Sequence, residues 1–158
     1  MIFLTLGTQL PFDRLVREVD AVAGRIDEPI FGQIGRSQFA PVNFPFVAEL
    51  SPHEFQQRIR AARVIIGHAG VGTILAARRE NKPLLMMARL SANAEHRNDH
   101  QVATARRLGG LPGMYVVESQ HDIEHYLHSN ISPPGRSDTA ALSRFIDNLR
   151  LTLTSATN

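Results

Sequence analysis

Residues 64–101 decide the fold, and they read VIIGHAGVGTILAARRENKPLLMMARLSANAEHRNDHQ. The β-branched run Val64–Ile66 predicts a strand buried on both faces, and a loop with three glycines follows at once. A helix is expected from about Thr73, whose hydroxyl can serve as its N-cap, and a second strand follows Pro83. This order of strand, glycine loop, helix and strand is typical of a parallel sheet.

The alternation of strands and helices extends over the whole chain. Pro11 suits the first position of a helix, and Ser51 with Glu54 predicts a capping box. Further strands are expected at 2–6, 29–34, 44–47 (toward an edge) and 115–117, and further helices at 11–23, 52–62, 101–108, 122–128 and about 137–153. The sequence therefore predicts an α/β fold, a Rossmann-like parallel sheet with helices on both faces.

Composition places this chain among ordinary globular proteins. Its 158 residues suit a single domain, 1–158, with 43% hydrophobic and 20% charged residues. A formal charge of +2 is too small to indicate nucleic-acid binding, and no cysteine is present for a disulfide or a thiolate metal site. No apolar run reaches the length of a membrane helix, and the first residues are expected to form a strand and not a signal peptide. We expect a cytoplasmic protein.

Gly67, Gly70 and Gly72 mark a candidate anion site. A glycine loop at a helix N-terminus presents unpaired N–H groups, and the helix dipole also favours a phosphate there. The loop is not a Walker A motif, because no lysine follows the last glycine, and it is a poor match to G-x-G-x-x-G. The alternative is that the glycines only close a tight turn.

A second polar cluster, EHRNDHQ at 95–101, follows the next strand. Ligands of open α/β sheets bind beyond the carboxyl ends of the strands, and both segments leave strands at that edge. N–H donors suit a phosphate, and carboxylate and amide groups suit sugar hydroxyls. The two segments together predict a site for a phosphorylated sugar.

Several histidines have two interpretations. His96 and His100 are four residues apart, but there is no HExxH motif and no evident third ligand, so zinc is not favoured. His68 lies in the glycine loop and is either structural or directed at a ligand. Gly7 and Thr8 form either a plain turn or part of the site.

Three stretches carry a resemblance to a known family. MIFLTLGTQLPFDRL (1–15), GHAGVGTILAARRENKPLLMMARL (67–90) and EHRNDHQVATA (95–105) resemble the family 28 glycosyltransferase C-terminal domain. The chain looks most like the short PssE-like or EpsE-like subunits of bacterial exopolysaccharide and capsule assembly. These are similar to the catalytic subunit of the eukaryotic two-part UDP-GlcNAc transferase.

The resemblance implies the C-terminal half of a GT-B glycosyltransferase. It implies a UDP-sugar donor, a polyprenyl-diphosphate-linked acceptor, and a membrane-anchored partner subunit that carries the acceptor half and holds this chain at the inner face of the membrane. No cofactor and no metal are expected. The residues carried over are Gly70, Gly72 and Thr73 for the diphosphate, with His68 nearby; Glu95, His96, Asn98, Asp99, His100 and Gln101 for ribose and donor sugar; and Gly7 and Thr8 at the cleft.

Some assignments stay open at this point. Related transferases often carry a ribose-binding Glu where this chain has Ala76, so either Glu95 replaces it or the donor is held differently. The general base is either His68 or a group of the partner. Arg89 or Arg97 near the donor would favour a uronic acid, although either could be a surface charge.

Alternatives to the donor-binding role also remain. The chain could be a non-catalytic subunit that stimulates another transferase. A sugar-nucleotide epimerase of the same fold is less favoured, because such enzymes need both halves in one chain. The helix at 137–153 either docks a partner or covers its own sheet.

Overall fold

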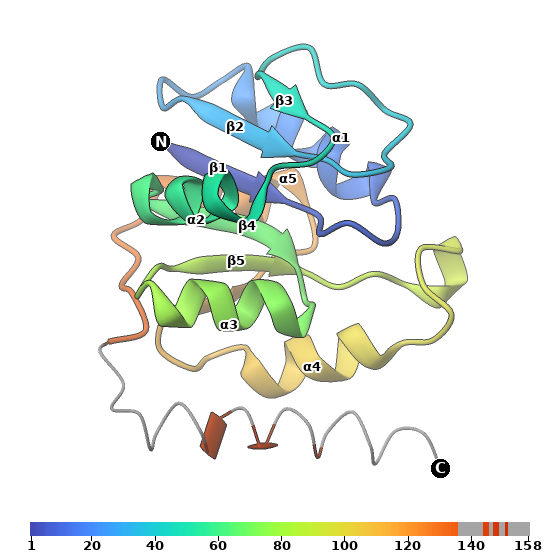
Figure 1. Ribbon diagram of the computed structural model, residues 1–158, viewed down its shortest axis with the longest axis vertical. Helices are drawn as coiled ribbons and strands as arrows, with labels where there is room; N and C mark the ends of the chain where they lie inside the picture. The colour runs from blue at the N-terminus through green and yellow to red at the C-terminus, as the bar shows by residue number, and fades with distance from the viewer. Residues whose placement is uncertain (136–143, 146, 149–150, 152–158) are drawn as a thin grey trace.

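The computed structural model describes residues 1–135, 144–145, 147–148 and 151, and its centre is one parallel sheet (Figure 1). The strands follow the order β3-β2-β1-β4-β5-β6, and every pair of neighbours is parallel. Their bounds are β1 Ile2–Thr5, β2 Ile30–Gln33, β3 Phe46–Val47, β4 Val64–His68, β5 Leu84–Met87 and β6 Met114–Val116. The strand order reverses between β1 and β4, which confirms the Rossmann-like prediction.

Five α-helices and a short 3₁₀ turn connect these strands within the described residues. They are α1 Asp13–Ala23, α2 Pro52–Ala61, α3 Val71–Arg79, the 3₁₀ turn η1 Ser91–Asn93, α4 His100–Leu108 and α5 Gln120–His128. The predicted capping box of α2 is present: the Glu54 N–H donates to the Ser51 hydroxyl, and the Ser51 N–H donates to the Glu54 carboxylate.

Apolar side chains cover both faces of the sheet. On one face, Ile66 and Leu85 pack in a cluster with α1 and α5 residues such as Val16 and Ile123. On the other, Ile65 and Leu84 pack with side chains of α2, α3 and α4. Neighbouring residues of a strand point to opposite faces, so the continuous apolar runs of β4 and β5 fill both layers.

Several helix starts differ from the prediction: α4 begins at His100 and α5 at Gln120, one and two residues earlier than expected. Pro11 is not the first residue of α1, which begins at Asp13 after Phe12. Thr73 is not the N-cap of α3 either, because that helix begins at Val71 with Gly70 as its cap. The Thr73 side chain is buried, and a Cβ on Gly67 would lie 2.9 Å from its methyl carbon. Thr73 thus packs against β4, and Gly67 belongs to that strand.

The predicted helix at 137–153 lies mostly outside the described residues. Of those described, Phe145 packs against the cluster on the α3 side of the sheet, and the Arg78 guanidinium lies 4.1 Å from the centre of its ring. Among the helices that the structure describes, none combines the length and apolar character needed to cross a bilayer.

Candidate functional site

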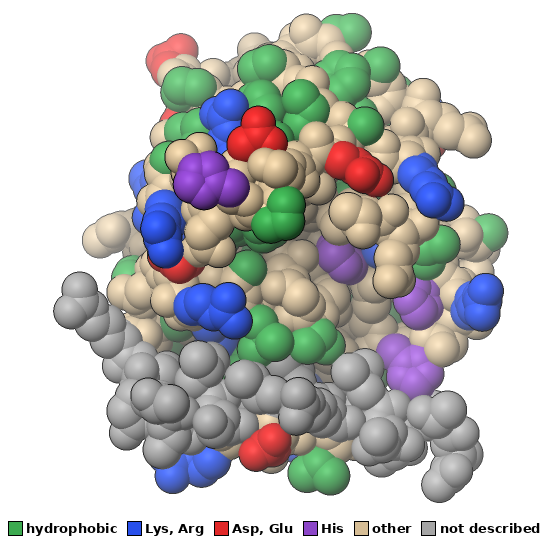
Figure 2. Space-filling view, in the orientation of Figure 1, with side chains coloured by type: hydrophobic (Ala, Val, Ile, Leu, Met, Phe, Trp, Pro, Cys, Tyr) green, Lys and Arg blue, Asp and Glu red, His purple; other side chains and the backbone are tan. Residues whose placement is uncertain are grey.

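The candidate site is a cavity of about 1010 Å³ at the carboxyl ends of β1, β4 and β5. Figure 2 shows this face of the molecule hollowed near its centre, with several histidine side chains to the right of the hollow. The loop after β1, the glycine loop after β4 and the polar loop after β5 all contribute to the wall. The predicted residues that line it are Gly7, Thr8, His68, Gly70, Gly72, Thr73, His96, Asn98, His100 and Gln101.

His68 lies between two glycines from different loops. A Cβ on Gly70 would lie 2.1 Å from the His68 Nε2 atom, and one on Gly7 would lie 3.2 Å from its Cε1 atom. Gly7 also has a φ of +70°, a conformation that side chains disfavour. The two glycines therefore make room for the imidazole ring, which joins the first loop to the start of α3.

Burial lowers the pKa of His68 to about 4, and the electrostatic effects of Arg89 and His96 act in the same direction. The ring is therefore neutral at physiological pH. A base with so low a pKa accepts a proton poorly, so the structure offers little support for His68 as the general base.

The N-terminus of α3 opens into the cavity. Its cap, Gly70, provides no side chain to accept hydrogen bonds from the first-turn amides. A Cβ on Gly72 would meet no atom within 4 Å, so a ligand can approach the backbone there. This end of the helix has the geometry of an anion site.

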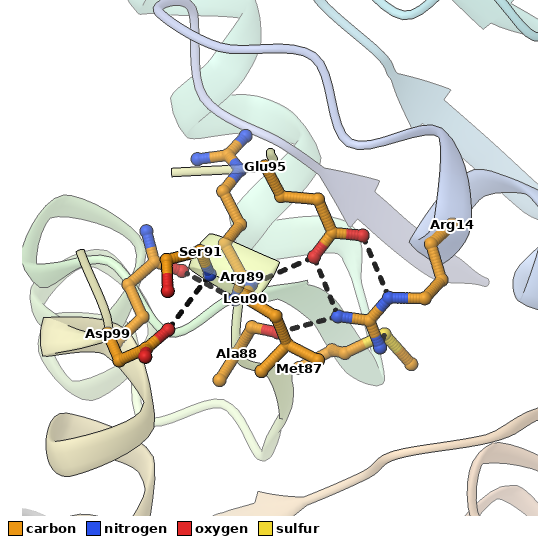
Figure 3. A network of polar contacts seen from close by, with 9 residues as sticks. Arg14, Met87, Ala88, Arg89, Leu90, Ser91, Glu95 and Asp99 are labelled. Atoms are coloured by element: carbon orange, nitrogen blue, oxygen red, sulfur yellow. Dashed lines mark hydrogen bonds and ion pairs between the residues drawn. The ribbon is translucent and has the colours of Figure 1, made fainter. Parts of the chain in front are cut away.

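Glu95 has a different position from its predicted neighbours, because it does not line the cavity. Its carboxylate forms a two-point ion pair with Arg14 of α1, at 2.9 Å from Nε and 2.8 Å from Nη2 (Figure 3). It also accepts the Leu90 N–H at 2.9 Å, while Arg14 donates to the Ala88 carbonyl at 2.8 Å. Glu95 therefore fastens the polar loop to α1.

Burial raises the pKa of Glu95, but hydrogen bonds from Arg14 and the Leu90 amide outweigh it and leave the pKa below its ordinary value. Glu95 is ionised at neutral pH. Position 76, at which related transferases often carry Glu, is an alanine on the cavity wall. No carboxylate therefore reaches the cavity from position 76 or from Glu95.

The other polar residues of this loop divide into two groups. Asp99 does not line the cavity, and its carboxylate accepts the Ser91 N–H at 2.8 Å. His96, Asn98 and His100 are on the cavity wall. Gln101 belongs to both groups: it lines the cavity, and its side-chain oxygen accepts the backbone N–H of Arg89 at 3.2 Å. Sequence position alone does not separate these roles.

Arg89 is a residue whose place the sequence left open. It is only 3% exposed and lines the cavity, so it is not a surface charge. Arg97, in contrast, is exposed and does not line the cavity. Burial lowers the pKa of Arg89 to about 10, with an opposing effect from Glu95, and the guanidinium stays charged at neutral pH.

The wall of the cavity is positively charged. Its charge comes from Arg79 and Arg89, and none of its described lining residues is Asp or Glu. The described residues also hold no group of three His, Cys, Asp or Glu placed to bind a metal ion. Positive side chains and a helix N-terminus at one cavity favour an anionic ligand.

Comparison with protein families gives a match that covers most of the chain. The model of the glycosyltransferase family 28 C-terminal domain matches residues 1–144. This chain belongs to that family. A comparison with curated protein sequences returned no match.

Solved structures share the fold at low sequence identity. An NMR structure of ALG13 matches with a TM-score of 0.63 and 18% identity, over 91% of this chain and 93% of that one. The glycosyltransferase of kitacinnamycin matches at 0.62 and 20%, over 98% and 39% of the two chains. SnogD of Streptomyces nogalater matches at 0.52 and 22%, over 97% and 37%. The chain thus spans about two fifths of the last two, and these matches support a GT-B C-terminal fold.

Proposed function

We propose that this chain is the donor-binding catalytic subunit of a two-component inverting glycosyltransferase. The donor is a UDP-sugar, and the acceptor is a sugar on a polyprenyl diphosphate used in exopolysaccharide or capsule synthesis. The observation that carries the proposal is a cavity that has no acidic residue in its described lining and into which both the α3 N-terminus and the polar loop open. It suits a diphosphate beside a polyhydroxylated sugar.

The chemistry needed from this half is stabilisation of the leaving group. In an inverting transfer, the acceptor hydroxyl attacks the anomeric carbon while UDP departs, and negative charge grows on the diphosphate. The amides at residues 70–73 and the positive wall of the cavity are placed to stabilise that charge. We therefore propose that an added cation is not obligatory.

Contacts to the sugar and ribose are assigned to the polar loop. His96, Asn98, His100 and Gln101 bring imidazole and amide groups to the cavity wall, which suit hydroxyl groups. Glu95 and Asp99 hold the loop in shape. Gly7 and Thr8 lie on the wall formed by the loop after β1, where the acceptor half would face.

A partner subunit completes the proposed enzyme. This chain spans about two fifths of the longer glycosyltransferase chains, and in the proposed enzyme a partner supplies the half that faces this domain. That partner would provide the general base, bind the lipid-linked acceptor, and keep this chain on the cytoplasmic side of the membrane.

The test is calorimetric titration with UDP-glucose, UDP-galactose, UDP-GlcNAc and UDP-glucuronic acid, each with and without the membrane partner. We expect weak binding of one UDP-sugar alone, tighter binding in the complex, and transfer to lipid-linked acceptor only in the complex. Strong turnover by the purified chain on a soluble acceptor would contradict the two-component proposal.

The same complex tests the non-catalytic alternative. Gly72→Ala places a methyl group where a ligand is expected and where no protein atom lies within 4 Å. It should lower turnover and leave complex formation intact. Unchanged turnover in a complex of normal composition would favour a purely stimulatory subunit.

A further inference from the structure

Arg89 is a buried cation without an ion-pair partner among the described residues. The five ion pairs in that part of the chain do not include it. Glu95 lies near enough to affect its pKa, but the Glu95 oxygens are already bonded to Arg14 and to the Leu90 amide. Removing a charge from water is costly unless an opposite charge and hydrogen bonds replace the water.

The hydrogen bonds of the guanidinium use only part of its capacity. Its Nη2 donates to the Leu6 carbonyl at 3.1 Å and to the Leu10 carbonyl at 2.7 Å. Its Nε is buried and has no hydrogen-bond partner in the described structure. A guanidinium has five N–H groups arranged to bind the oxygens of a carboxylate or phosphate. Its direct neighbours are thus two neutral carbonyls and the Phe12 ring, whose centre lies 5.1 Å from the guanidinium carbon, and none of them carries an opposite charge.

Arg89 also lies close to the N-terminus of α3. His68 and Met87 are paired across β4 and β5, and Arg89 follows two residues after Met87. The charge of Arg89 acts on His68, whose ring packs on Gly70. The cation and the helix N-terminus thus both neighbour one imidazole ring, in one cavity whose described lining residues include no Asp or Glu.

We propose that Arg89 binds the diphosphate of the nucleotide sugar and, together with the α3 N-terminus, supplies the positive charge that stabilises it as a leaving group. The proposal rests on the function proposed above and adds a residue to it. The bound diphosphate is then the counter-ion that none of the described residues provides by direct contact. Because Arg89 also donates hydrogen bonds to the Leu6 and Leu10 carbonyls, it couples nucleotide binding to the conformation of the loop after β1.

The experiment compares the affinities of the full chain for UDP, uridine, UDP-glucose and UDP-glucuronic acid in the wild type, Arg89→Gln and Arg89→Lys. Loss of charge-assisted hydrogen bonds should weaken UDP and both UDP-sugars by about 10- to 100-fold, with little change for uridine. Arg89→Lys should recover part of the loss. Arg97→Gln removes the same charge from an exposed position near the site and should change little.

Three results would overturn the proposal. Equal losses for uridine and UDP would show a purely structural role, and a loss confined to UDP-glucuronic acid would place the sugar carboxylate, not the diphosphate, on Arg89. Equal effects of Arg97→Gln and Arg89→Gln would show a general charge effect.

A second measurement keeps the proposal testable if Arg89→Gln does not fold. In the wild-type chain, the Arg89 Nε–H resonance should shift on addition of UDP or inorganic pyrophosphate. A resonance that responds to neither overturns the proposal. A response to pyrophosphate without a preference for UDP supports the role of Arg89 and instead contradicts the proposed UDP-sugar donor.

Discussion

Replacing Glu95 with Gln removes the charge from the ion pair that joins the polar loop to α1. In the wild type, the carboxylate accepts from Arg14 at 2.9 and 2.8 Å and from the Leu90 amide at 2.9 Å. The glutamine oxygen can keep one of these hydrogen bonds, but the glutamine cannot balance the Arg14 charge. The loop that carries His96 and Asn98 into the cavity should then be held less firmly.

The expected loss follows from the burial of the pair. The Glu95 side chain is 11% exposed and that of Arg14 is 26% exposed, so solvent screens the pair less than it screens a surface ion pair. Hydrogen bonds to charged groups contribute about 1.5–3 kcal/mol each in buried settings. Allowing for the residual exposure and for the hydrogen bond that Gln keeps, we expect the free energy of unfolding to fall by about 1–2 kcal/mol.

The assay is a double-mutant cycle of Arg14→Met and Glu95→Gln, measured by urea denaturation. We expect the two changes to be non-additive, with a coupling energy of about 1 kcal/mol or more. The Arg25–Glu124 pair provides a matched control, since it has the same two-point geometry but lies exposed. Its coupling should be clearly smaller.

The pH dependence gives an independent check. The pKa of Glu95 is depressed in the folded chain, so its stabilising effect is present above the unfolded pKa, near 4.5, and is lost as the pH falls through the folded pKa. The coupling should therefore disappear in acid. Coupling indistinguishable from zero at pH 7 would refute this account of Glu95. A far larger loss of UDP affinity in Glu95→Gln than in Arg14→Met would instead support direct contact with the ribose.

Three further predictions concern the glycine loop. Gly70→Ala places a Cβ 2.1 Å from the His68 ring and should lower the free energy of unfolding by about 1–3 kcal/mol in denaturation experiments. Gly72→Ala should fold normally, because its Cβ meets no atom, and should bind UDP at least about fivefold more weakly. A stable Gly70→Ala or an unaffected Gly72→Ala would contradict the geometry of this loop. The depressed pKa of His68 means that the unfolded chain binds a proton that the folded chain does not, so stability should fall by up to about 3 kcal/mol between pH 6.5 and pH 4. In His68→Gln this contribution should be absent, and parallel stability curves for the two proteins would contradict it.

Much of the fold could be predicted from the sequence, because the central strands of the sheet are short, largely apolar runs. Val64–Ile66 and 84–87 lie in neighbouring central strands, as their β-branched and apolar residues indicated. The start of α3 was harder to place. Thr73 is a common N-cap residue, but here its methyl group packs against Gly67, a contact that depends on the tertiary structure.

The candidate site shows a similar division. The convergence of the glycine and polar loops followed from the parallel sheet, and ten of the twelve predicted site residues line the cavity. Glu95 and Asp99 do not, because their carboxylates bond to groups of the same loop and, for Glu95, to Arg14. That pairing spans 81 residues and has no local sequence signal. The position of Arg89 likewise has no local sequence signal, because the Leu6 and Leu10 carbonyls to which it donates belong to the loop after β1.

The most direct test of the donor site is the NMR titration of the labelled chain with UDP. We predict that the amide resonances of residues 70–73 and 96–101 shift together, and that uridine shifts those of 70–73 much less. No response at millimolar UDP, or a response in only one of the two segments, would contradict the proposal that both segments bind one nucleotide sugar.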